Sequence, residues 1–539
     1  MANKSLFKGR RGTKAAPANT TNKAGGVAYN MPTDHALAQM AATCTFGDTY
    51  YTKADEQLST MLELAQKVHP EFVAKTAIFA RERGFMKDAP ALLLAVLAAS
   101  GDEGLRMFKK IFHRVIDNGR MLRTFVQIVR SGITGRRSFG SAIKREIQNW
   151  LGSKPVDMIF RWSVGNDPSM ADIIKMVHPK AEGERAALYG YLVGKWRSKM
   201  EFDAVPQLVR HYEAFKALKL EADDPKNASA ELPKVPFQML DSLPLTTQEW
   251  SQMLRNGGWH FTRMNINTAK RHGVLEDPEM VNLIARKLAD ATQIRQSKVF
   301  PYQLLMAYIA SDAPPKIKRA LHDAMEIATE NTPELSKGVA VCVDTSGSMT
   351  QPITGYQDTN LQGTGFGPSS NSAMRCVDVA GLIAAVFVRK NPETIVVPFD
   401  TCTHKVKFDP FDTIMTNAQK FSRNGGGTNC ACAIHALNAQ KVTSEVVVMV
   451  SDFEAWAERL YMLRAGTGLA QEWAIYKARV PNAKLVNINL VAGRTTQAEN
   501  ASDVYNISGF SDQIFTLVAD WVNGYDTDHW VQTIMKIDL

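Results

Sequence analysis

The sequence has no run of 18 apolar residues, so it offers no segment long enough to span a bilayer. No apolar stretch of the kind that a secretory signal carries follows the first methionine, and we therefore expect a cytoplasmic protein with no membrane partner. Acidic residues are absent from the first 30 residues, which carry six basic ones. This imbalance predicts a flexible basic tail over residues 1–30 that adds phosphate contacts without reading sequence.

Cysteine is scarce, with six residues in 539. Cys430 and Cys432 are one residue apart and no second pair accompanies them, so the spacing of a zinc site is missing. We interpret the cysteines as reduced thiols of a cytosolic protein. The sequence also lacks a Walker lysine loop, an H-E-x-x-H motif and a Ser/His/Asp order, and we expect no enzyme activity.

The net charge of +9 is unevenly distributed along the chain. Residues 338–539 hold 15 Lys and Arg against 19 Asp and Glu, which leaves 48 against 35 for residues 1–337. The N-terminal part is therefore basic and the C-terminal part is acidic. A basic region favours a polyanionic partner, usually RNA or DNA, although a solvated surface with an incidental excess would show the same counts.

Residues 34–331 follow a helical pattern, with apolar residues at i, i+3 and i+4 and breaks that carry Gly or Pro. Strand signals are almost absent there. The pattern predicts an α-solenoid of HEAT or armadillo type, whose closure into a ring the sequence does not determine. Helices are predicted at 56–68, 70–82, 89–100, 104–118, 121–131, 142–151, 171–177, 186–195, 202–219, 247–256, 278–290, 301–309 and 316–329.

From residue 338 the period changes to alternating strands and helices, which predicts a doubly wound parallel α/β sheet. Strands are expected at 338–343, 394–400, 445–450 and 484–491, and helices at 373–390, 430–441, 471–479 and 511–523. A Gly/Ser/Thr/Gln insert at 351–371 is placed to act as a lid, although a plain surface loop is the simpler interpretation. A chain of 539 residues is too long for one core.

Two apolar strands of this sheet end in acids. The first ends in a D-x-S-x-S loop, the second ends before an aspartate, and a Gly-Gly-Gly-Thr loop lies between two helices. Ligands bind at the carboxyl ends of strands in such sheets, and hard oxygens suit Mg²⁺, Mn²⁺ or Ca²⁺. A helix cap or a turn would explain any one of these residues alone. The predicted metal ligands are Asp344, Ser346, Ser348, Thr428 and Asp452.

Together these residues resemble the metal-ion-dependent adhesion site of von Willebrand factor type A domains. In those domains the metal keeps an open position for a partner's carboxylate, and we expect Mg²⁺ as the ion. Two-metal nucleases need clustered carboxylates, and only Asp344 and Asp452 are expected to converge here.

Residues 101–150 hold 11 basic residues and four acidic ones. Such an excess is enough for a surface that follows a phosphate backbone, with strong salt dependence and little sequence preference. A solvated side chain remains the simple explanation for any single arginine. The candidates for RNA contact in this stretch are Lys109, Arg114, Arg136, Arg137, Lys144 and Arg145.

The order of the motifs is similar to that of the Ro ribonucleoprotein family, the TROVE-domain proteins, and its bacterial-type branch fits best. The resemblance runs from about residue 30 to the end. The motifs that carry it are Phe46 to Tyr51, Gly140 to Arg145 with Asn149 and Trp150, Ile173 to Lys180, Met253 to Asn256 with Thr262 to Met264, Phe300 to Leu305, and the sequence DTSGSM at 344–349.

The resemblance implies a closed helical-repeat ring over residues 31–335 and a type A domain over residues 336–539. Family members take single-stranded RNA 3′ ends in the ring, bind a small noncoding Y RNA outside it, and act in RNA surveillance, with exoribonucleases in bacteria. It places Arg161 and His178 on the inner rim, with Arg255 and Arg263 as further candidates, and implies no catalysis. We expect a monomer.

Some positions depart from the family pattern. Gly165 stands where members can carry a second basic residue, and the segment from Arg255 to His260 carries added bulk. Without the resemblance, His178 would be interpreted as a helix-end residue. Two other functions stay open at this point: an adaptor in which the type A domain serves an ATPase or another partner, and a metal-dependent nuclease.

Overall fold

The computed structural model describes residues 15–49, 51–194, 204–221, 231–297, 299, 301–330, 334–335, 338–353, 374–421, 425–457, 466–509, 513–523 and 530–539. The chain divides into two compact units. The sheet unit comprises residues 1–68, 298–310 and 322–537, and the helical unit comprises residues 69–297, 311–321 and 538–539. Most of the insert predicted at 351–371 and the first 14 residues of the predicted tail lie outside the described residues.

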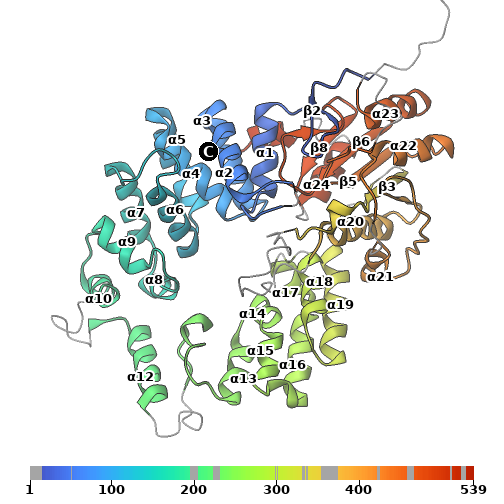
Figure 1. Cartoon of the computed structure of the whole chain (residues 1–539). Coiled ribbons are helices and arrows are strands. Elements are labelled where there is room, and N and C mark those ends of the chain that lie inside the picture. The colour runs from blue at the N-terminus through green and yellow to red at the C-terminus, as the bar shows by residue number, and fades with distance from the viewer. Residues whose placement is uncertain are drawn as a thin grey trace, which may run out of the picture. The chain divides into compact units, whose positions relative to one another are not determined.

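The helical unit is built from a succession of short helices that pack on their neighbours along the chain (Figure 1). Its helices are α3 (Pro70–Glu82), α4 (Asp88–Ala99), α5 (Gly101–Val115), α6 (Gly119–Ser131), α7 (Ser141–Ser153), α8 (Val156–Arg161), α9 (Met170–Val177), α10 (Gly183–Leu192), α12 (Gln207–Glu221), α13 (Thr247–Asn256), α14 (Trp259–Met264), α15 (Ile266–Arg271), α16 (Pro278–Leu288) and α17 (Ala291–Ser297), with 3-10 turns η2 (Phe237–Met239) and η3 (Val274–Glu276). Helix α19 (Pro315–Thr329) contributes residues to both units.

Aromatic residues fill the space between α5 and α6. The rings of Phe108 and Phe125 stack with centroids 5.8 Å apart, and Phe112 meets the Phe125 ring edge-on at 5.6 Å. Trp150 of α7 is buried and its indole N–H donates to the carbonyl of Ile116 at 2.6 Å, which caps the end of α5. Apolar residues at helical spacing thus bury one face of each helix, as the sequence pattern predicts.

A buried ion pair joins α12 to α13. Lys219 Nζ lies 2.8 Å from Glu249 Oε2, and the two side chains are 0% and 1% exposed. Glu249 also accepts from the backbone N–H of Thr246 at 2.8 Å, which completes a capping box at the start of α13. Removing either charge would take from the other the ion-pair partner shown here.

The sheet unit holds two sheets and the helices that cover them (Figure 1). The strands are β1 (Thr20–Thr21), β2 (Val27–Asn30), β3 (Val339–Asp344), β4 (Ile395–Phe399), β5 (Val446–Ser451), β6 (Lys484–Asn489), β7 (Thr495–Thr496) and β8 (Val504–Ser508). The helices are α1 (Thr33–Thr43), α2 (Ala54–Lys67), α18 (Pro301–Ala310), α20 (Cys376–Lys390), α21 (Ile414–Gln419), α22 (Cys430–Ala439), α23 (Gly468–Arg479), α24 (Gln513–Asn523) and α25 (Trp530–Met535), with a 3-10 turn η4 (Gly347–Thr350).

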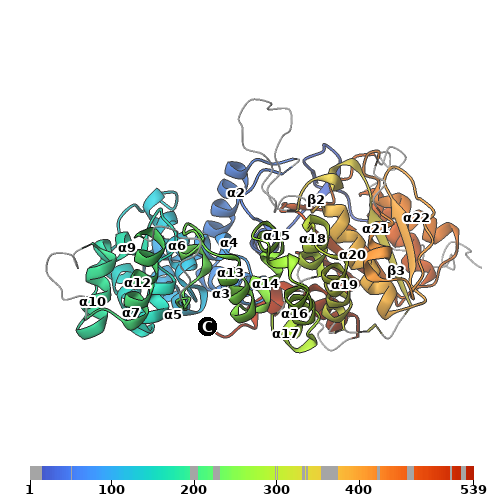
Figure 2. The ribbon, with the colours of Figure 1, turned by 90° about the horizontal axis from the view of Figure 1, so that it is seen from below.

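The larger sheet has the strand order β4-β3-β5-β6-β8, and every neighbouring pair is parallel. Strand β3 therefore lies between β4 and β5 and is buried along its whole length. Helices α22 and α23 cover the face of the sheet to which Cys342 and Met449 point. Phe387 of α20 contacts Phe515 of α24, so α20 and α24 lie together. Figure 2 shows α20 and α21 side by side, next to β3. The fold class expected from the sequence, helical repeats together with a doubly wound parallel sheet, is confirmed.

The segment that precedes α1 belongs to the sheet unit. Strand β2 pairs with β7 across Tyr29 and Thr496, and the amide of Asn22 donates to the carbonyl of Ala455 at 2.7 Å. A Cβ at Gly26 would lie 1.8 Å from that same carbonyl oxygen, so this close approach requires glycine. The sequence predicted a flexible tail through residue 30. Instead, residues 20–21 and 27–30 form strands β1 and β2, which pair with each other, and β2 also pairs with β7 more than 400 positions away.

None of the helices in the described ranges is long and apolar enough to cross a membrane.

Candidate metal centre and nucleic-acid surface

The carboxyl ends of β3 and β5 bring two aspartates to one edge of the sheet. Val343 and Val450 are paired in register, so Asp344, which ends β3, lies beside Ser451, which ends β5. Asp452 follows directly. Asp344 is 0% exposed and Asp452 is 3% exposed, so both carboxylates lie in the interior of the sheet unit.

The loop after β3 is held in a tight turn. The backbone N–H of Ser346 donates to Asp344 Oδ1 at 2.8 Å, and the hydroxyls of Ser346 and Ser348 lie 3.2 Å apart. Both serines are buried. The N–H and the hydroxyl of Thr345 donate to the carbonyl of Phe399 at 2.7 and 2.9 Å, which fixes the loop against the end of β4. Three of the five predicted ligands thus share one short, anchored loop.

The glycine-rich loop before α22 lies against this turn. The N–H of Gly347 donates to the carbonyl of Gly426 at 3.1 Å, and Gly426 has a φ of +81°, which favours glycine. A Cβ at Gly427 would lie 2.4 Å from the ring of Trp456, so this position also needs a bare backbone. Thr428 follows and is 1% exposed. The structure therefore brings the loop that carries the fourth predicted ligand to the loop that carries the first three.

The two carboxylates repel each other in a dry environment. Burial, and then the negative charge of Asp452, raise the pKa of Asp344 to about 7. Burial raises the pKa of Asp452 as well, and the nearby Ser348 hydroxyl offsets part of that shift. Ser451 donates its hydroxyl to Asp344 Oδ2 at 2.5 Å, but Asp452 Oδ2 is buried and accepts no hydrogen bond from a described residue. An orphaned carboxylate oxygen beside a second carboxylate and two hydroxyls fits a hard divalent cation.

Two residues of this centre, Ser451 and Glu454, were not predicted from the sequence to have a role. Ser451 was visible there only as the neighbour of Asp452, and its contact with Asp344 depends on the register of β3 and β5. Glu454 is buried, and burial followed by the charge of Asp452 raises the pKa of Glu454 to about 7. Its carboxylate accepts from the backbone N–H of Ala24 at 3.2 Å, a contact across 430 positions that no local pattern predicts.

Comparison with known proteins finds relatives of both this region and the whole chain. A family model described as the Ro60 vWA domain matches residues 339–522, which include β3, the metal loop and β5. The RNA-binding protein RO60 of Deinococcus radiodurans is 22% identical over 518 residues, which cover 91% of this chain and 92% of that protein. Residues 339–522 thus match the vWA domain of Ro60 proteins. A crystal structure titled as the Ro (Rsr) protein of the same organism has a TM-score of 0.62 and 17% identity, covering 92% of this chain and 100% of that one.

Two of the arginines predicted to contact RNA already bind protein groups. Arg114 forms a two-pronged ion pair with Glu82, with both N–O distances at 2.8 Å. Arg136 donates to the carbonyl of Ala98 at 2.7 Å. These guanidinium groups join α5 to α3 and the loop before α7 to α4, so their contacts are structural.

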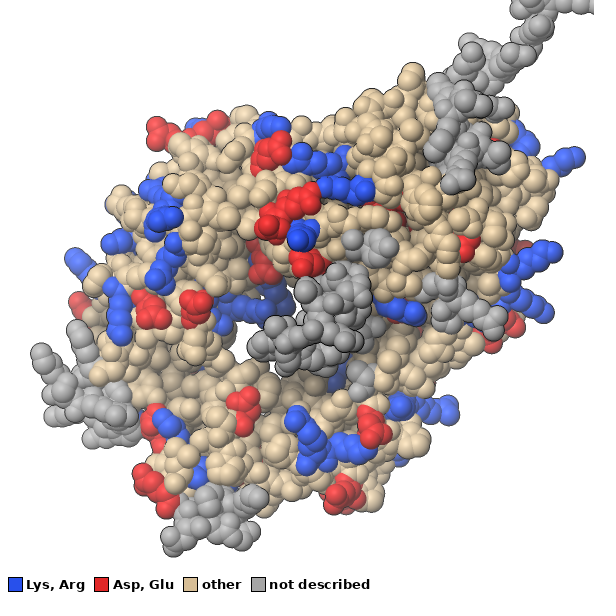
Figure 3. Space-filling view, viewed as in Figure 1, with Lys and Arg blue, Asp and Glu red and all other residues tan. Residues whose placement is uncertain are grey.

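Other predicted cations are open to solvent or half-buried and form no ion pair with a described residue. Lys109 lies on α5, Lys144 and Arg145 lie on α7, and Arg137 lies in the loop before α7. Helices α5 and α7 pack on each other, so three of these side chains belong to neighbouring helices. Figure 3 shows Lys and Arg side chains gathered over α7 and the helices beside it. We call Lys109, Arg137, Lys144 and Arg145 the α5–α7 cations.

His178 lies at the end of α9 and is exposed. Its φ of 51° is left-handed, a conformation in which histidine is more common than most residues, and its N–H donates to the carbonyl of Ile174 at 2.9 Å. The side-chain amide of Gln148 on α7 donates to the carbonyl of Val177 at 2.6 Å, which ties this helix end to the α5–α7 cations. His178 thus ends a helix and also presents its side chain to solvent.

Arg161, Arg255 and Arg263 belong to a different part of the helical unit. Arg161 Nε donates to the carbonyl of Lys234 at 2.9 Å, Arg255 lies exposed in the last turn of α13, and Arg263 is half-buried on α14. The structure therefore separates the predicted RNA residues into two groups. One group is the α5–α7 cations with His178, and the other surrounds the segment that contains Lys234.

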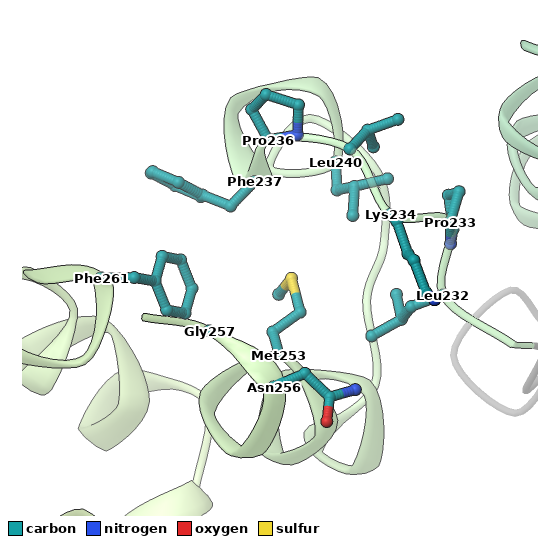
Figure 4. Close-up of a pocket in the computed structure, with 11 residues that line it drawn as sticks. Leu232, Pro233, Lys234, Pro236, Phe237, Leu240, Met253, Asn256, Gly257 and Phe261 are labelled. Carbon is teal, nitrogen blue, oxygen red and sulfur yellow. The ribbon is translucent and has the colours of Figure 1, made fainter. Parts of the chain in front are cut away.

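A pocket of about 310 Å³ opens beside this second group. Figure 4 shows Phe237 and Phe261 on one side of it, Lys234 on the opposite side, and Met253 between them with Asn256 below it. The two rings meet edge to face with centroids 5.6 Å apart. Apolar walls with one amide and one ammonium suit a flat aromatic ring that has polar edges, such as a nucleobase. This pocket is not apparent from the sequence, because the two segments that form its walls are about 20 residues apart.

Lys87 and Arg120 form a further pair of neighbouring cations that the sequence did not predict. Burial, followed by the positive charges of Arg120 and Arg81, lowers the pKa of Lys87. Lys87 lies just before α4 and Arg120 lies in the first turn of α6, so only the packing of α4 on α6 brings them together. Local positive charge that destabilises an ammonium is also charge that attracts a phosphate.

Proposed function

We propose that this protein binds RNA through its helical unit and acts as the RNA-binding component of a ribonucleoprotein in RNA surveillance. The observation that carries the proposal is the α5–α7 cations, which are free of intramolecular ion pairs among the described residues and belong to packed neighbouring helices. The relative of this chain that is named an RNA-binding protein supports the same conclusion. We assign RNA binding to residues 31–335, with the basic residues of 1–30 adding phosphate contacts.

The RNA we propose is a small noncoding RNA of the Y type, together with single-stranded 3′ ends of misfolded or decaying RNAs. Cations without paired carboxylates attract phosphates of any sequence, which suits a protein that inspects varied RNAs. An unpaired base near a strand end is free to enter the pocket of Phe237 and Phe261, whereas a base in a duplex is not. A partner exoribonuclease would then act on the bound RNA, since we assign no catalysis to this chain.

The experiment compares full-length protein with a Lys109→Glu/Arg145→Glu variant in a gel shift over a salt series. Both side chains are exposed, so the fold should be kept. Because each phosphate contact to a single strand contributes about 0.7 to the slope of log affinity against log salt, losing two contacts should lower the slope by about 1.4. The probe is a duplex with a single-stranded 3′ tail, compared with the same duplex blunt.

A matched control is Lys405→Glu/Lys407→Glu, which makes the same charge change at exposed positions in the sheet unit. This control should bind RNA as the unmodified protein does. If both double variants weaken binding equally, the effect is only net charge and the helical assignment is wrong. If neither the tailed nor the blunt RNA binds, an adaptor that serves an ATPase or another protein partner becomes the better explanation.

We further propose that Asp344, Ser346, Ser348, Thr428 and Asp452 hold a divalent metal ion, Mg²⁺, in a type A domain over residues 336–539. The support is the pair of buried carboxylates whose pKa values are raised and the orphaned Asp452 Oδ2. The bound ion would supply positive charge to these carboxylates and an attachment point for an acidic group of a protein partner. We place the protein in the cytoplasm as a monomer.

A further inference from the structure

Three side chains with metal-ligand chemistry converge on the turn that follows β4. The sequence there is D-T-C-T-H, and Asp400, Cys402 and His404 occupy alternate positions of it. The carboxylate oxygen, the thiol sulfur and an imidazole nitrogen all lie within 4.8 Å of one another. This cluster is separate in composition from the metal loop, whose ligands are all oxygens.

The backbone holds this turn in a hairpin. Phe399 and Thr403 form an antiparallel bridge, the N–H of Asp400 donates to the carbonyl of Cys402 at 3.0 Å, and the N–H of His404 donates to the carbonyl of Pro398 at 2.8 Å. The positions of the three side chains therefore follow from paired backbone. A site that is formed before its ligand binds loses little conformational entropy on binding.

The distances between the side chains match those of a tetrahedral zinc centre. Asp400 Oδ1 lies 3.0 Å from His404 Nε2 and 3.8 Å from Cys402 Sγ. Zinc bonds of about 2.0 Å to oxygen and nitrogen and about 2.3 Å to sulfur, at tetrahedral angles, place the oxygen about 3.3 Å from the nitrogen and about 3.6 Å from the sulfur. Each observed distance lies within a few tenths of an ångström of these values.

The three side chains form a site that is buried at its base and open to solvent at its rim. Asp400 is only 8% exposed and forms the floor, whereas Cys402 and His404 are exposed at the rim. Cys402 is the exposed one of the six cysteines, all of which the structure describes. The carboxylate alone explains the turn, because Asp400 Oδ1 already accepts from the N–H of Cys402 at 3.1 Å. Neither a thiol at 402 nor an imidazole at 404 is needed for that turn.

We propose that Asp400, Cys402 and His404 form a zinc site in the sheet unit, with water in the fourth position. One sulfur, one nitrogen and one oxygen suit Zn²⁺ and disfavour Mg²⁺, which prefers oxygen alone. Cys402 binds as the thiolate and releases its proton to solvent, and His404 binds through Nε2 as the neutral imidazole. The site lies next to the glycine-rich loop, since a Cβ at Gly426 would lie 3.2 Å from Asp400 Oδ2.

The test uses full-length protein stripped of metal and then titrated with Zn²⁺ in the presence of excess Mg²⁺. We expect one Zn²⁺ per chain, and with Co²⁺ as a substitute, a thiolate-to-cobalt absorption band in the near ultraviolet. The variants Cys402→Ser and His404→Gln should each lower the affinity for Zn²⁺ at least 10-fold, in line with the loss of one of three protein ligands. Cys402→Ser should also abolish the absorption band.

The control variant is His435→Gln, which removes an exposed histidine of the same unit that pairs with Glu472 at 3.1 Å. It should bind Zn²⁺ as the unmodified protein does, and so should Asp344→Asn. Zinc affinity that is unchanged in both Cys402→Ser and His404→Gln would overturn the proposal. Zinc that Mg²⁺ displaces, or that Asp344→Asn loses, would equally overturn it by assigning the ion to the metal loop.

Discussion

Replacing Asp344 with asparagine should make the metal-free protein more stable and should also remove its response to Mg²⁺. The substitution takes away one of two buried carboxylates whose ionised forms are disfavoured by burial and by each other. The carboxamide oxygen can still accept from the N–H of Ser346, which holds the turn in the unmodified protein at 2.8 Å. The amide nitrogen that replaces Oδ2 cannot accept from the Ser451 hydroxyl, so the loss of that buried hydrogen bond offsets part of the electrostatic gain.

The magnitude follows from the pKa of Asp344, which rises from 3.8 to about 7. At roughly 1.4 kcal/mol per pKa unit, the ionised carboxylate lowers the free energy of unfolding of the metal-free protein by about 4 kcal/mol. A change of 1 kcal/mol shifts the melting temperature of a domain of this size by about 2–4 °C. Asp344→Asn should thus raise the melting temperature in a chelator at pH 8 by up to about 8–16 °C.

The pH dependence has a definite sign. Between pH 3.8 and about 7 the folded state keeps a proton on Asp344 that the unfolded state has released, so the stability of the metal-free protein falls as the pH rises through this range. Well above pH 7, Asp344 is ionised in both states and the stability of the metal-free protein no longer falls because of this group. Mg²⁺ should therefore stabilise the unmodified protein strongly at pH 8 and only weakly at pH 5, where protons already neutralise the carboxylates.

The assay is thermal unfolding of the sheet unit in full-length protein, followed with and without Mg²⁺ at pH 5 and pH 8. At a Mg²⁺ concentration 100 times the dissociation constant, the unmodified protein should gain about 2.7 kcal/mol. The control is Glu393→Gln, an exposed acid of the same unit, which should respond to Mg²⁺ normally. An Asp344→Asn protein that is less stable than the unmodified one in chelator at pH 8, yet still stabilised by Mg²⁺, would refute the electrostatic reasoning.

Two other predictions concern the helical unit. Phe261→Ala should weaken binding of a single strand with an unpaired 3′ base by about 1–3 kcal/mol, the range for one lost stacking contact, while Phe411→Ala at a position 92% exposed in the sheet unit leaves binding unchanged. Equal losses of affinity in both variants, or no loss in Phe261→Ala, would contradict the proposal that an unpaired base binds in the pocket. Glu249→Gln should keep the capping box yet remove the buried ion-pair partner of Lys219, lowering the free energy of unfolding measured with denaturant by roughly 3–5 kcal/mol. The exposed pair of Glu103 with Arg106 provides the control, since Glu103→Gln should cost under about 1 kcal/mol, and comparable losses would contradict the assignment of a buried pair.

The sequence predicted four of the five strands of the larger sheet because their signals are local, and it missed β8. The apolar run before Asp344 predicted a buried strand over 338–343, and the strand found is Val339–Asp344. The second acidic strand end, at Asp452, was equally visible. The register that joins them was not, because nothing in either strand states that β3 and β5 are neighbours.

The helical unit was predicted as a class but not in its contacts. Helical periodicity shows which face of a helix is buried, and it does not show which arginine will find a carboxylate. Arg114 and Lys109 were both candidates for RNA contact, yet Arg114 pairs with Glu82 from another helix while Lys109 stays in solvent. Contacts between distant segments, such as that of Arg161 with Lys234, likewise depend on tertiary packing.

The pairing of β2 with β7 has a consequence for biosynthesis. On the ribosome, Tyr29 emerges more than 450 residues before its partner Thr496, and the helical unit is made in between. Strand β2 can pair with β1 at once, but it must wait for β7 until nearly the whole polypeptide has been translated. A nascent chain stalled before residue 495 cannot complete this small sheet, and a label on residues 27–30 would report the moment when β7 has been made and paired.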